Sequence, residues 1–286
     1  MLLKGIFMSN QVKFRPIFVT GTGTDVGKTY VTALLCQALK SHIEERYSLD
    51  HDHSLLERSV GYYKAAISGA DCIEESDAGY INNFAHLGQD LNSLTSYLYQ
   101  EAVSPHLAQQ HQGSEPISIS KIQHDFLQVS DHSQLTVLEG SGGIYCPLCW
   151  NHEPLEQELT QKHEQNTDLN HASAMMSCIE QGRYTIADFM KRLSTQYGLS
   201  IVVVGDAALG CINNVVMTLT SLKAEGFNLK DVSVIINNYD EHNAMHVDNV
   251  RMIEAMTKIP VIAKVAKGDT CLVLDEQGLD NLLVKA

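Results

Sequence analysis

The stretch Gly21-Thr22-Gly23-Thr24-Asp25-Val26-Gly27-Lys28-Thr29 decides the fold, because it joins an apolar run to a helical pattern. The run before it reads RPIFVT (15–20), and the segment after it reads YVTALLCQALK (30–40). Backbone amides of such a glycine-rich turn can surround phosphate oxygens, and the N-terminus of the following helix also attracts anions. Lys28 would then reach the β- and γ-phosphates of a nucleoside triphosphate, and the Thr29 hydroxyl would meet a magnesium ion.

The spacing inside this loop separates it from other glycine-rich turns. Five residues stand between Gly21 and Gly27, one more than in the common phosphate-binding loop. A dinucleotide-binding turn is disfavoured, since the last glycine interval is too long for G-x-G-x-x-G and that motif needs no Gly-Lys-Thr. A plain glycine-rich turn is the other alternative, but the order of strand, loop, Gly-Lys-Thr and helix disfavours it. We therefore expect a nucleoside triphosphate as ligand and a P-loop NTPase-like fold.

Short β-rich runs recur along the chain, and several precede a helical pattern, which is typical of a parallel sheet covered by helices. The run IVVVG (201–205) is apolar at successive positions, as in a strand buried on both faces. We predict one doubly wound, mainly parallel α/β domain over residues 1–286. Its expected strands are 14–20, 60–67, 135–138, 200–204, 232–237 and 260–265.

Two polar segments, 41–58 and 151–183, interrupt this rhythm, and we expect both to be surface insertions. Residues 1–13 are expected to form a loose N-terminal extension, with Met8 as an alternative start. Cys146 and Cys149 have the spacing of half a zinc site, which the histidines of 151–183 and Cys178 could complete. Because no second close pair follows, a polar surface insertion is the preferred alternative.

Composition limits the classes of partner. The 34 acidic and 20 basic residues give a formal net charge of -14, which disfavours nucleic acid. No run is long and apolar enough to span a bilayer, and the first residues lack the apolar core of a secretory signal. Seven scattered cysteines indicate free thiols in a reducing compartment, so we expect a cytoplasmic protein without a membrane partner.

Polar side chains also follow the later strands, at the edge where open α/β sheets bind ligands. Lys64 and Ser68 stand near the end of the second run, and Asp77 follows in an acidic segment. Glu139 directly follows the third run and opens the flexible sequence Gly140-Ser141-Gly142-Gly143. Phosphoryl transfer needs such charges to position the metal and the transferred group.

In this order the motifs resemble the dethiobiotin synthase family, from about Ile17 to Val265 apart from the two insertions. The family's phosphate loop has the same five-residue interval. The matching positions are Thr24-Asp25 before Val26-Gly27-Lys28-Thr29, then Lys64, Ser68 and Gly69, Ser76-Asp77, Ser104-Pro105-His106, Glu139 to Gly143, Gly210-Cys211-Ile212-Asn213, and Asn237.

The resemblance implies that the ATP phosphates contact the loop from Gly23 to Thr29 and that Asn237 reads the adenine edge. It also implies Mg²⁺ ligands at Thr29, Asp77 and Glu139, all oxygen donors as that ion prefers. Asp71, Glu74 and Glu75 lie close to Asp77 in the sequence and remain alternatives to it as the acidic ligand.

The implied reaction joins 7,8-diaminopelargonate and CO2 with ATP. Lys28 and Lys64 would neutralise charge on the γ-phosphate and on a substrate carbamate, while Thr24 and Ser68 would hydrogen-bond the reacting groups. The amides of Gly210 to Asn213 would bind the substrate carboxylate, and in the family that helix comes from the second subunit of a homodimer. No covalent enzyme intermediate is implied.

Three positions depart from the family's motifs, and two other classes of protein are weighed as alternatives. Asp25 replaces a common Glu, Ala65 replaces a proline, and Lys264-Val265-Ala266 replaces a proline-bearing segment, so the other base and ribose contacts are not mapped. An amidotransferase-type synthetase of cobalamin assembly would need a longer chain. A partitioning or regulatory ATPase would carry a lysine where Gly23 stands.

Overall fold

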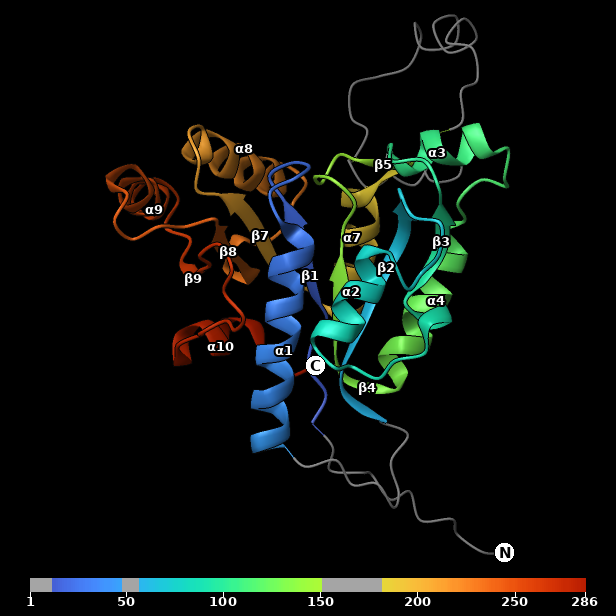
Figure 1. Ribbon diagram of the computed structural model, residues 1–286, viewed down its shortest axis with the longest axis horizontal. Helices are drawn as coiled ribbons and strands as arrows, with labels where there is room; N and C mark the ends of the chain where they lie inside the picture. The colour runs from blue at the N-terminus through green and yellow to red at the C-terminus, as the bar shows by residue number, and fades with distance from the viewer. Residues whose placement is uncertain (1–11, 48–56, 151–181) are drawn as a thin grey trace, which may run out of the picture.

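The computed structural model describes residues 12–47, 57–150 and 182–286 of the chain. Its main element is a seven-stranded sheet in the order β3-β2-β4-β1-β7-β8-β9, in which every neighbouring pair is parallel (Figure 1). The strands are β1 (Ile17–Gly21), β2 (Arg58–Ser68), β3 (Thr95–Tyr99), β4 (Ser133–Glu139), β7 (Ser200–Asp206), β8 (Val232–Asn237) and β9 (Val261–Lys264).

Helices cover both faces of this sheet. One face carries α1 (Lys28–Arg46), α2 (Asp77–Phe84) and α10 (Glu276–Leu282). The other carries α3 (Pro105–Gln112), α4 (Ile119–Asp131), α7 (Ile186–Tyr197), α8 (Cys211–Ala224) and α9 (Ala244–Thr257). Short 3-10 turns, η1 (Leu91–Ser93) and η2 (Leu229–Asp231), precede β3 and β8.

The alternation of side chains along β1 divides the core between the two faces. Phe18 packs into the cluster that contains α4 and α7, whereas Ile17 and Val19 pack against α1. Leu35 of α1 is fully buried on that face, and one such side chain stabilises the fold by about 1.5–3 kcal/mol. The predicted doubly wound, mainly parallel fold is thereby confirmed.

The strand predictions differ from the structure at the edge of the sheet. The sequence analysis missed β3, whose residues TSYLY are buried only at the two ends of the strand and lack a continuous apolar run. The first strand begins at Ile17 and not at Phe14, because Pro16 has no amide hydrogen for the ladder. Phe14 instead forms an isolated bridge with Lys285.

The predicted insertion 41–58 begins too early, because Ser41 to Arg46 continue α1. Ile43, inside that charged stretch, is fully buried against the sheet, which gives the helix an apolar contact. Arg58 already belongs to β2. Residues 48–56 of this predicted insertion lie outside the described part of the chain, as do residues 1–11 of the predicted extension.

The second predicted insertion is bounded by a small antiparallel pair, β5 (Pro147–Trp150) and β6 (Arg183–Thr185). Residues 151–181 between them lie outside the described ranges. Val12 and Lys13 were predicted to be loose, but the Lys13 carbonyl accepts a hydrogen bond from the Ala286 amide at 2.9 Å. Among the described helices, none has the length and apolar character needed to cross a membrane.

Candidate active site

The loop between β1 and α1 has the conformation that phosphate binding requires. Gly27 precedes α1 with φ at 81°, and a Cβ atom there would lie 2.0 Å from Asn237 Nδ2, so only glycine fits. Lys28 begins the helix, is 8% exposed and donates through Nζ to the Gly23 carbonyl at 2.8 Å. The loop amides therefore lie at a helix N-terminus at the carboxyl edge of the sheet (Figure 1).

Lys64 lies beside this loop and joins two carboxylates. It comes from β2, and its Nζ lies 2.6 Å from Asp77 Oδ2 and 2.7 Å from Glu139 Oε1. The hydroxyl of Thr29, in the first turn of α1, donates to Glu139 Oε1 at 3.2 Å. Two strands, β2 and β4, and two helices, α1 and α2, thus bring four predicted site residues into contact.

The electrostatics of this cluster follow from burial and charge. Burial alone would lower the pKa of Lys64, but the negative charges of Glu139 and Asp77 outweigh it and raise that pKa to about 12. Burial would raise the pKa of the Asp77 carboxyl, yet the charge of Lys64 and hydrogen bonds from Lys64 and Thr29 lower it. At neutral pH the cluster therefore holds one ammonium group between two carboxylates.

The same cluster fits a magnesium ion. Thr29, Asp77 and Glu139 offer one hydroxyl and two carboxylates, the oxygen donors that Mg²⁺ prefers. Glu139 Oε2 is buried and has no hydrogen-bond partner in the described structure, so it has an unused acceptor in the cluster. Asp77 lies in the first turn of α2 and accepts a hydrogen bond from Thr29 in the first turn of α1, which distinguishes it from the competing acidic residues of that segment.

A cavity of about 480 Å³ contains these groups. Ser68 also lines it, but its hydroxyl donates to the Val103 carbonyl at 2.6 Å, which ties the end of β2 to the loop before α3. The residues around the cavity are Thr24, Asp25, Gly27, Lys28, Thr29, Lys64, Ser68, Asp77, Ala102, Val103, Ser104, Pro105, Glu139, Ser141, Gly142 and Cys146.

Ser141 and Cys146 are among the cavity residues to which the sequence analysis gave no role in the reaction. Ser141 donates to the Ala66 carbonyl at 2.9 Å and so ties the loop after β4 to β2. Cys146 also lines the cavity, and burial raises the pKa of its thiol, although the charges of Lys28 and Lys64 oppose this. The Glu139 to Gly143 motif was the available signal for Ser141, whereas Cys146 was marked only by its spacing from Cys149, as part of the zinc alternative.

Asn237 lies beneath the phosphate loop at the end of β8. It is 3% exposed, and its Nδ2 donates to the Val26 carbonyl at 3.1 Å. Its Oδ1 is buried without a partner among the described residues, so an acceptor remains beside the loop. Asn237 therefore supports the loop directly, a contact that the sequence analysis did not predict.

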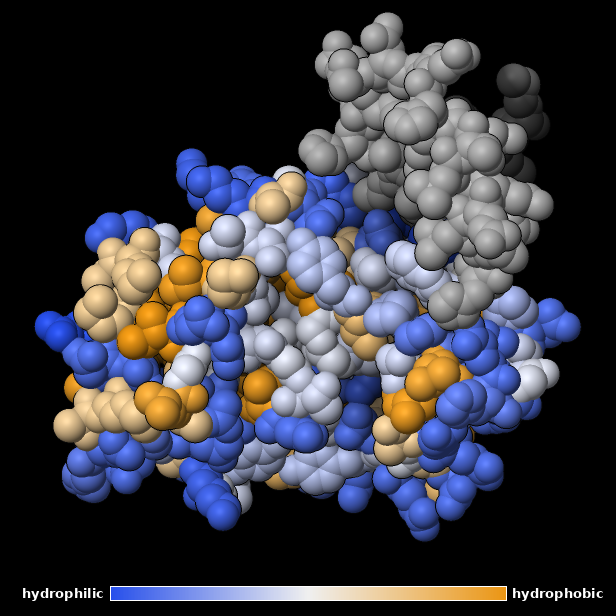
Figure 2. Space-filling view, turned by 90° about the horizontal axis from the view of Figure 1, so that it is seen from above, coloured by the Kyte–Doolittle hydropathy of each residue, from blue (hydrophilic) through white to orange (hydrophobic). Residues whose placement is uncertain are grey.

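The predicted substrate-carboxylate site lies apart from the cavity. Gly210 precedes α8 with φ at 94°, and Cys211 is buried, while none of the residues from Gly210 to Asn213 lines the cavity around Lys64. Figure 2 looks onto the edge where the strands end, and apolar side chains gather there on the side of α8 and α9. Leu209, 89% exposed, lies in the loop just before α8, and Met217, 58% exposed, lies within α8.

A second cavity, of about 650 Å³, lies between the loops that follow β8 and β9. The Tyr239 amide donates to the Val265 carbonyl at 2.8 Å, which joins the two loops. Tyr30 of α1 donates to the Asp269 carbonyl and so fixes the second loop to the helix that starts at the phosphate loop. The residues that line this second cavity are Asn238, Tyr239, Asp240, Glu241, His242, Lys264, Ala266, Lys267 and Asp269.

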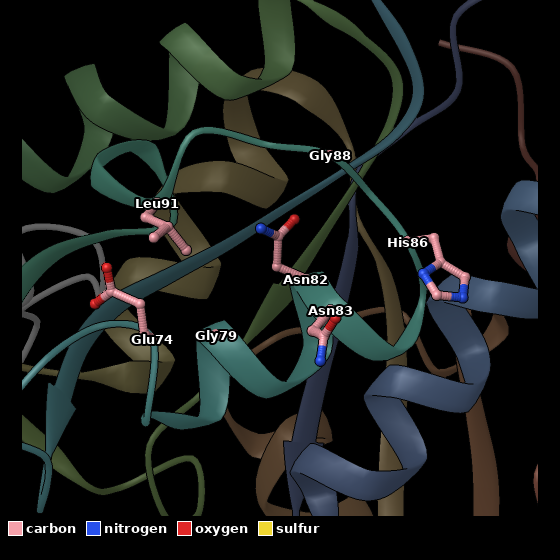
Figure 3. Close-up of a pocket in the computed structure, with 7 residues that line it drawn as sticks. All are labelled: Glu74, Gly79, Asn82, Asn83, His86, Gly88 and Leu91. Atoms are coloured by element: carbon pink, nitrogen blue, oxygen red, sulfur yellow. The ribbon is translucent and has the colours of Figure 1, made fainter.

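A third cavity, of about 530 Å³, borders α2 and lacks a comparable cluster (Figure 3). Glu74 and His86 are its titratable residues, and they lie on opposite sides of the view. Asn82 exchanges two hydrogen bonds with the backbone of Gln89, so its amide is already paired. We therefore place the chemistry at the cavity around Lys64.

The zinc alternative gains no ligand set within the residues the structure describes. No group of three histidine, cysteine, aspartate or glutamate side chains there could hold a metal ion. Cys149 is buried in β5, and Cys146 lines the active-site cavity. His152, His163, His171 and Cys178, the other members of that alternative, lie outside the described residues.

Comparison with known proteins agrees with the motif order. A family model described as an AAA domain matches residues 15–153 and 181–271. The ATP-dependent dethiobiotin synthetase BioD of Brachyspira hyodysenteriae is 32% identical over 268 residues, which cover 94% of this chain and 98% of that protein. The BioD protein of Clostridium botulinum strain Loch Maree is 34% identical over 251 residues, 86% of this chain and 88% of that protein.

Among solved structures, a ParA family ATPase from Chlorobium tepidum matches with a TM-score of 0.44 and 12% identity, over 94% of this chain and 88% of that one. That likeness is too distant to bear on function. The relatives at 31–34% identity do bear on function, because they carry one name and are matched over 88–98% of their own length. The chain therefore belongs to the ATP-dependent dethiobiotin synthetase family and is an ATP-dependent enzyme of the ligase class.

Proposed function

We propose that this enzyme closes the ureido ring of dethiobiotin from 7,8-diaminopelargonate and CO2, with release of ADP and phosphate. The observation that carries the proposal is the position of Lys64, in contact with Glu139 and Asp77 beside the phosphate loop. Such a reaction needs a triphosphate site, a metal site and a cation near the attacking oxygen, and residues for all three line one cavity. The names of the relatives supply the substrate class.

ATP would bind with its phosphates on the loop from Gly23 to Thr29. Lys28 would leave the Gly23 carbonyl and neutralise the β- and γ-phosphates. The nucleoside would extend past Asn237 toward the cavity between the β8 and β9 loops, where the unpaired Oδ1 of Asn237 can accept from the adenine amino group. Tyr239 and Lys264 are candidates for the remaining base contacts.

Mg²⁺ would be held by Thr29, Asp77 and Glu139. When bound, it would neutralise negative charge that develops on the phosphate oxygens. The unpaired Oε2 of Glu139 supports this assignment, because a buried carboxylate oxygen needs a partner. Lys64 would keep its charge throughout the neutral range, so it can pair with these carboxylates or with an anionic substrate.

The proposed chemistry proceeds in two stages. One amine of the substrate takes up CO2 as a carbamate, and a carbamate oxygen attacks the γ-phosphorus while the bond to the ADP oxygen breaks. The second amine then attacks the carbamoyl carbon, phosphate leaves, and the ring closes. Lys64 would stabilise the carbamate, and Thr24 and Ser68 would orient the reacting groups, so the chain would act by position and charge.

The substrate carboxylate would bind the first amides of α8 from the second subunit of a homodimer. Two observations support this: Gly210 to Asn213 do not line the cavity around Lys64 of their own chain, and Leu209 beside them is 89% exposed. We further propose that the chain forms one domain and acts in the cytoplasm. The cysteines in the described ranges are free thiols, as is usual in a reducing compartment.

Mass spectrometry tests the reaction. The purified protein is incubated with 7,8-diaminopelargonate, ATP, Mg²⁺ and either ordinary or ¹³C-labelled bicarbonate. We expect a product in which one carbonyl bridges both nitrogens, with the label retained in that carbonyl. ATP hydrolysis without this product would overturn the proposal and would favour the regulatory ATPase alternative.

A further inference from the structure

The carboxylate of Asp206 joins two loops at the carboxyl edge of the sheet. Asp206 is the last residue of β7, and its Oδ1 accepts from the Ala208 amide at 2.8 Å. Its Oδ2 accepts from Asn238 Nδ2, beyond the end of β8, at 2.6 Å. Hydrogen bonds to an ionised acceptor are shorter and stronger than neutral ones, so both contacts constrain the loops.

The first of these loops supports the nucleotide side of the site. Asn238 has φ at 55°, a left-handed conformation that asparagine tolerates better than most residues. It directly follows Asn237, which donates to the phosphate loop at the Val26 carbonyl. Asn238 and Tyr239 also line the cavity between the β8 and β9 loops. Holding the Asn238 side chain therefore fixes the backbone that carries both Asn237 and this cavity wall.

The second loop leads into α8. The Ala207 amide donates to the Asn237 carbonyl at 2.9 Å, and the Ala207 carbonyl accepts from the buried side chain of Asn249 at 2.9 Å. Ala208, held by Asp206, lies two residues before Gly210, where the proposed carboxylate-binding amides begin. The Ala208 carbonyl in turn accepts from the Cys211 amide at 3.0 Å, so the path from Asp206 to the start of α8 is short and hydrogen-bonded at both ends.

We propose that Asp206 is a positioning residue that sets the nucleotide loop and the start of α8 together. Asp206 makes no hydrogen bond to Lys28, Lys64 or Glu139. The loss of Asp206 therefore weakens the binding of nucleotide and substrate and leaves the chemical step nearly intact. The nucleotide half of this inference needs only the phosphate loop. The substrate half rests on the function proposed above.

Four variants separate these effects. Asp206→Ala removes both contacts, and Asn238→Ala removes only the contact with the nucleotide loop. In the exchange variant, Asp206→Asn with Asn238→Asp, the amide oxygen of the new asparagine accepts from Ala208 and its NH2 donates to the new aspartate, so both contacts return. Asp231→Ala, at the opposite edge of the sheet, is the matched control for a lost aspartate.

Calorimetric titration with ADP measures the nucleotide half and needs no turnover. We expect Asp206→Ala and Asn238→Ala to weaken ADP binding about tenfold, as the loss of a hydrogen bond to a charged group predicts, and the exchange variant to bind within about twofold of the native chain. Steady-state kinetics measures the substrate half. Asp206→Ala should raise the KM for 7,8-diaminopelargonate about tenfold and leave kcat within about twofold, whereas Asn238→Ala should leave that KM unchanged.

Several results would overturn the inference. They are native ADP affinity in Asp206→Ala, failure of the exchange variant to recover, or an equal loss in Asp231→Ala. A fall in kcat at unchanged KM would place Asp206 in the chemical step instead. If Asp206→Ala does not fold, Asn238→Ala and the exchange variant decide the nucleotide half. If the native chain binds ADP but forms no dethiobiotin, the proposed function fails while the ADP titrations still decide the role of Asp206 at the nucleotide.

Discussion

Lys64 has an unusual position for a lysine, because the residue is only 5% exposed and its ammonium group contacts two carboxylates. A buried charge is costly unless it is paired, and removal of one partner leaves the others uncompensated. The three groups therefore depend on one another. Any ligand that enters this cluster must replace one of these pairings with another of similar strength.

Replacing Lys64 with Gln tests its part in the chemistry. Because a preorganised positive charge near the γ-phosphate is lost, turnover should fall about a hundredfold or more. Ring closure is measured by product formation, and unfolding is followed in urea. Lys40→Gln is the control, since Lys40 lies on α1 away from the cavity and donates a hydrogen bond to the His86 carbonyl. A loss of stability without a loss of turnover would make Lys64 structural.

Lys28 should control the alkaline limit of nucleotide binding. Burial lowers its pKa below the ordinary value of 10.5, although the charge of Glu139 opposes this. Lys28 is charged below that lowered pKa and becomes neutral above it, so ADP binding should weaken as the pH rises toward 10.5. Lys28→Arg should flatten this dependence, because a guanidinium group stays charged. Calorimetric titrations between about pH 7 and about pH 10 measure it.

Lys28→Ala is the limiting case of the same experiment. We expect no turnover and no pH-dependent loss of ADP binding, with a native circular dichroism spectrum. Full activity in this variant would remove the phosphate-loop assignment. If Lys28→Arg loses ADP affinity at alkaline pH as the native chain does, a group other than Lys28 causes the pH dependence.

Spacing explains which site residues could be predicted. Lys28, Thr29 and Glu139 stand at fixed offsets from glycines, and the structure brings them into contact. Asp77 was one of several acidic residues, and only the start of α2 at that position turns its carboxylate toward Lys64. The spacing of Cys146 from Cys149 indicated only a zinc alternative, because the place of Cys146 in the cavity depends on how the segment after β4 folds.

At the scale of elements, the start of α2 positions a proposed metal ligand. The hydroxyl of Ser76 caps this helix by accepting from the Gly79 amide, and it donates to the Ile73 carbonyl at 2.7 Å. Asp77 follows immediately, so the cap determines where its carboxylate lies. The helix has only eight residues and therefore depends strongly on its ends.

Ser76→Ala should lower the free energy of unfolding by about 1 kcal/mol and raise the Mg²⁺ concentration needed for half-maximal activity. Ser118→Ala is the matched control, since Ser118 caps α4 by accepting from the Lys121 amide, far from the cavity. It should lose stability without a change in the Mg²⁺ requirement. Urea unfolding and Mg²⁺ titrations of activity supply both measurements. Equal Mg²⁺ requirements in the two variants would show that the Ser76 cap does not position a metal ligand.

Element boundaries were harder to predict than element types. The buried strands of the sheet centre have continuous apolar runs, so β7 and β8 could be located from the sequence. The edge strand β3 has half-buried residues at its centre and the last turns of α1 carry exposed polar residues, and the burial of both depends on contacts from distant segments. Periodicity in one segment does not contain that information.

At the scale of the whole molecule, the cavity around Lys64 and the start of α8 occupy different parts of one edge of the sheet. The proposed dimer would bring the two kinds of site together across subunits. The exposed side chains of Leu209 and Met217 on the α8 side suit such an interface, because large apolar side chains are more often covered than left in water.

A mixing experiment tests the shared site. Lys28→Ala and Asn213→Asp should each be inactive, the second because its added carboxylate repels that of the substrate. Equal mixing gives half heterodimers, each with one of two sites free of both changes, so activity should return to about a quarter of the native value. Native mass spectrometry confirms subunit exchange. Exchange without recovered activity would place both groups in one chain.

The pairing of β1 also governs how the molecule is made. β1 leaves the ribosome before both of its neighbours, one of which comes from Val137–Glu139 and the other from Ser200–Val204. The nascent chain must therefore carry an apolar strand with two open edges until much of the polypeptide has been synthesised. We expect chaperone supply and the speed of translation to govern the yield of this enzyme, since the finished sheet encloses β1 on both sides.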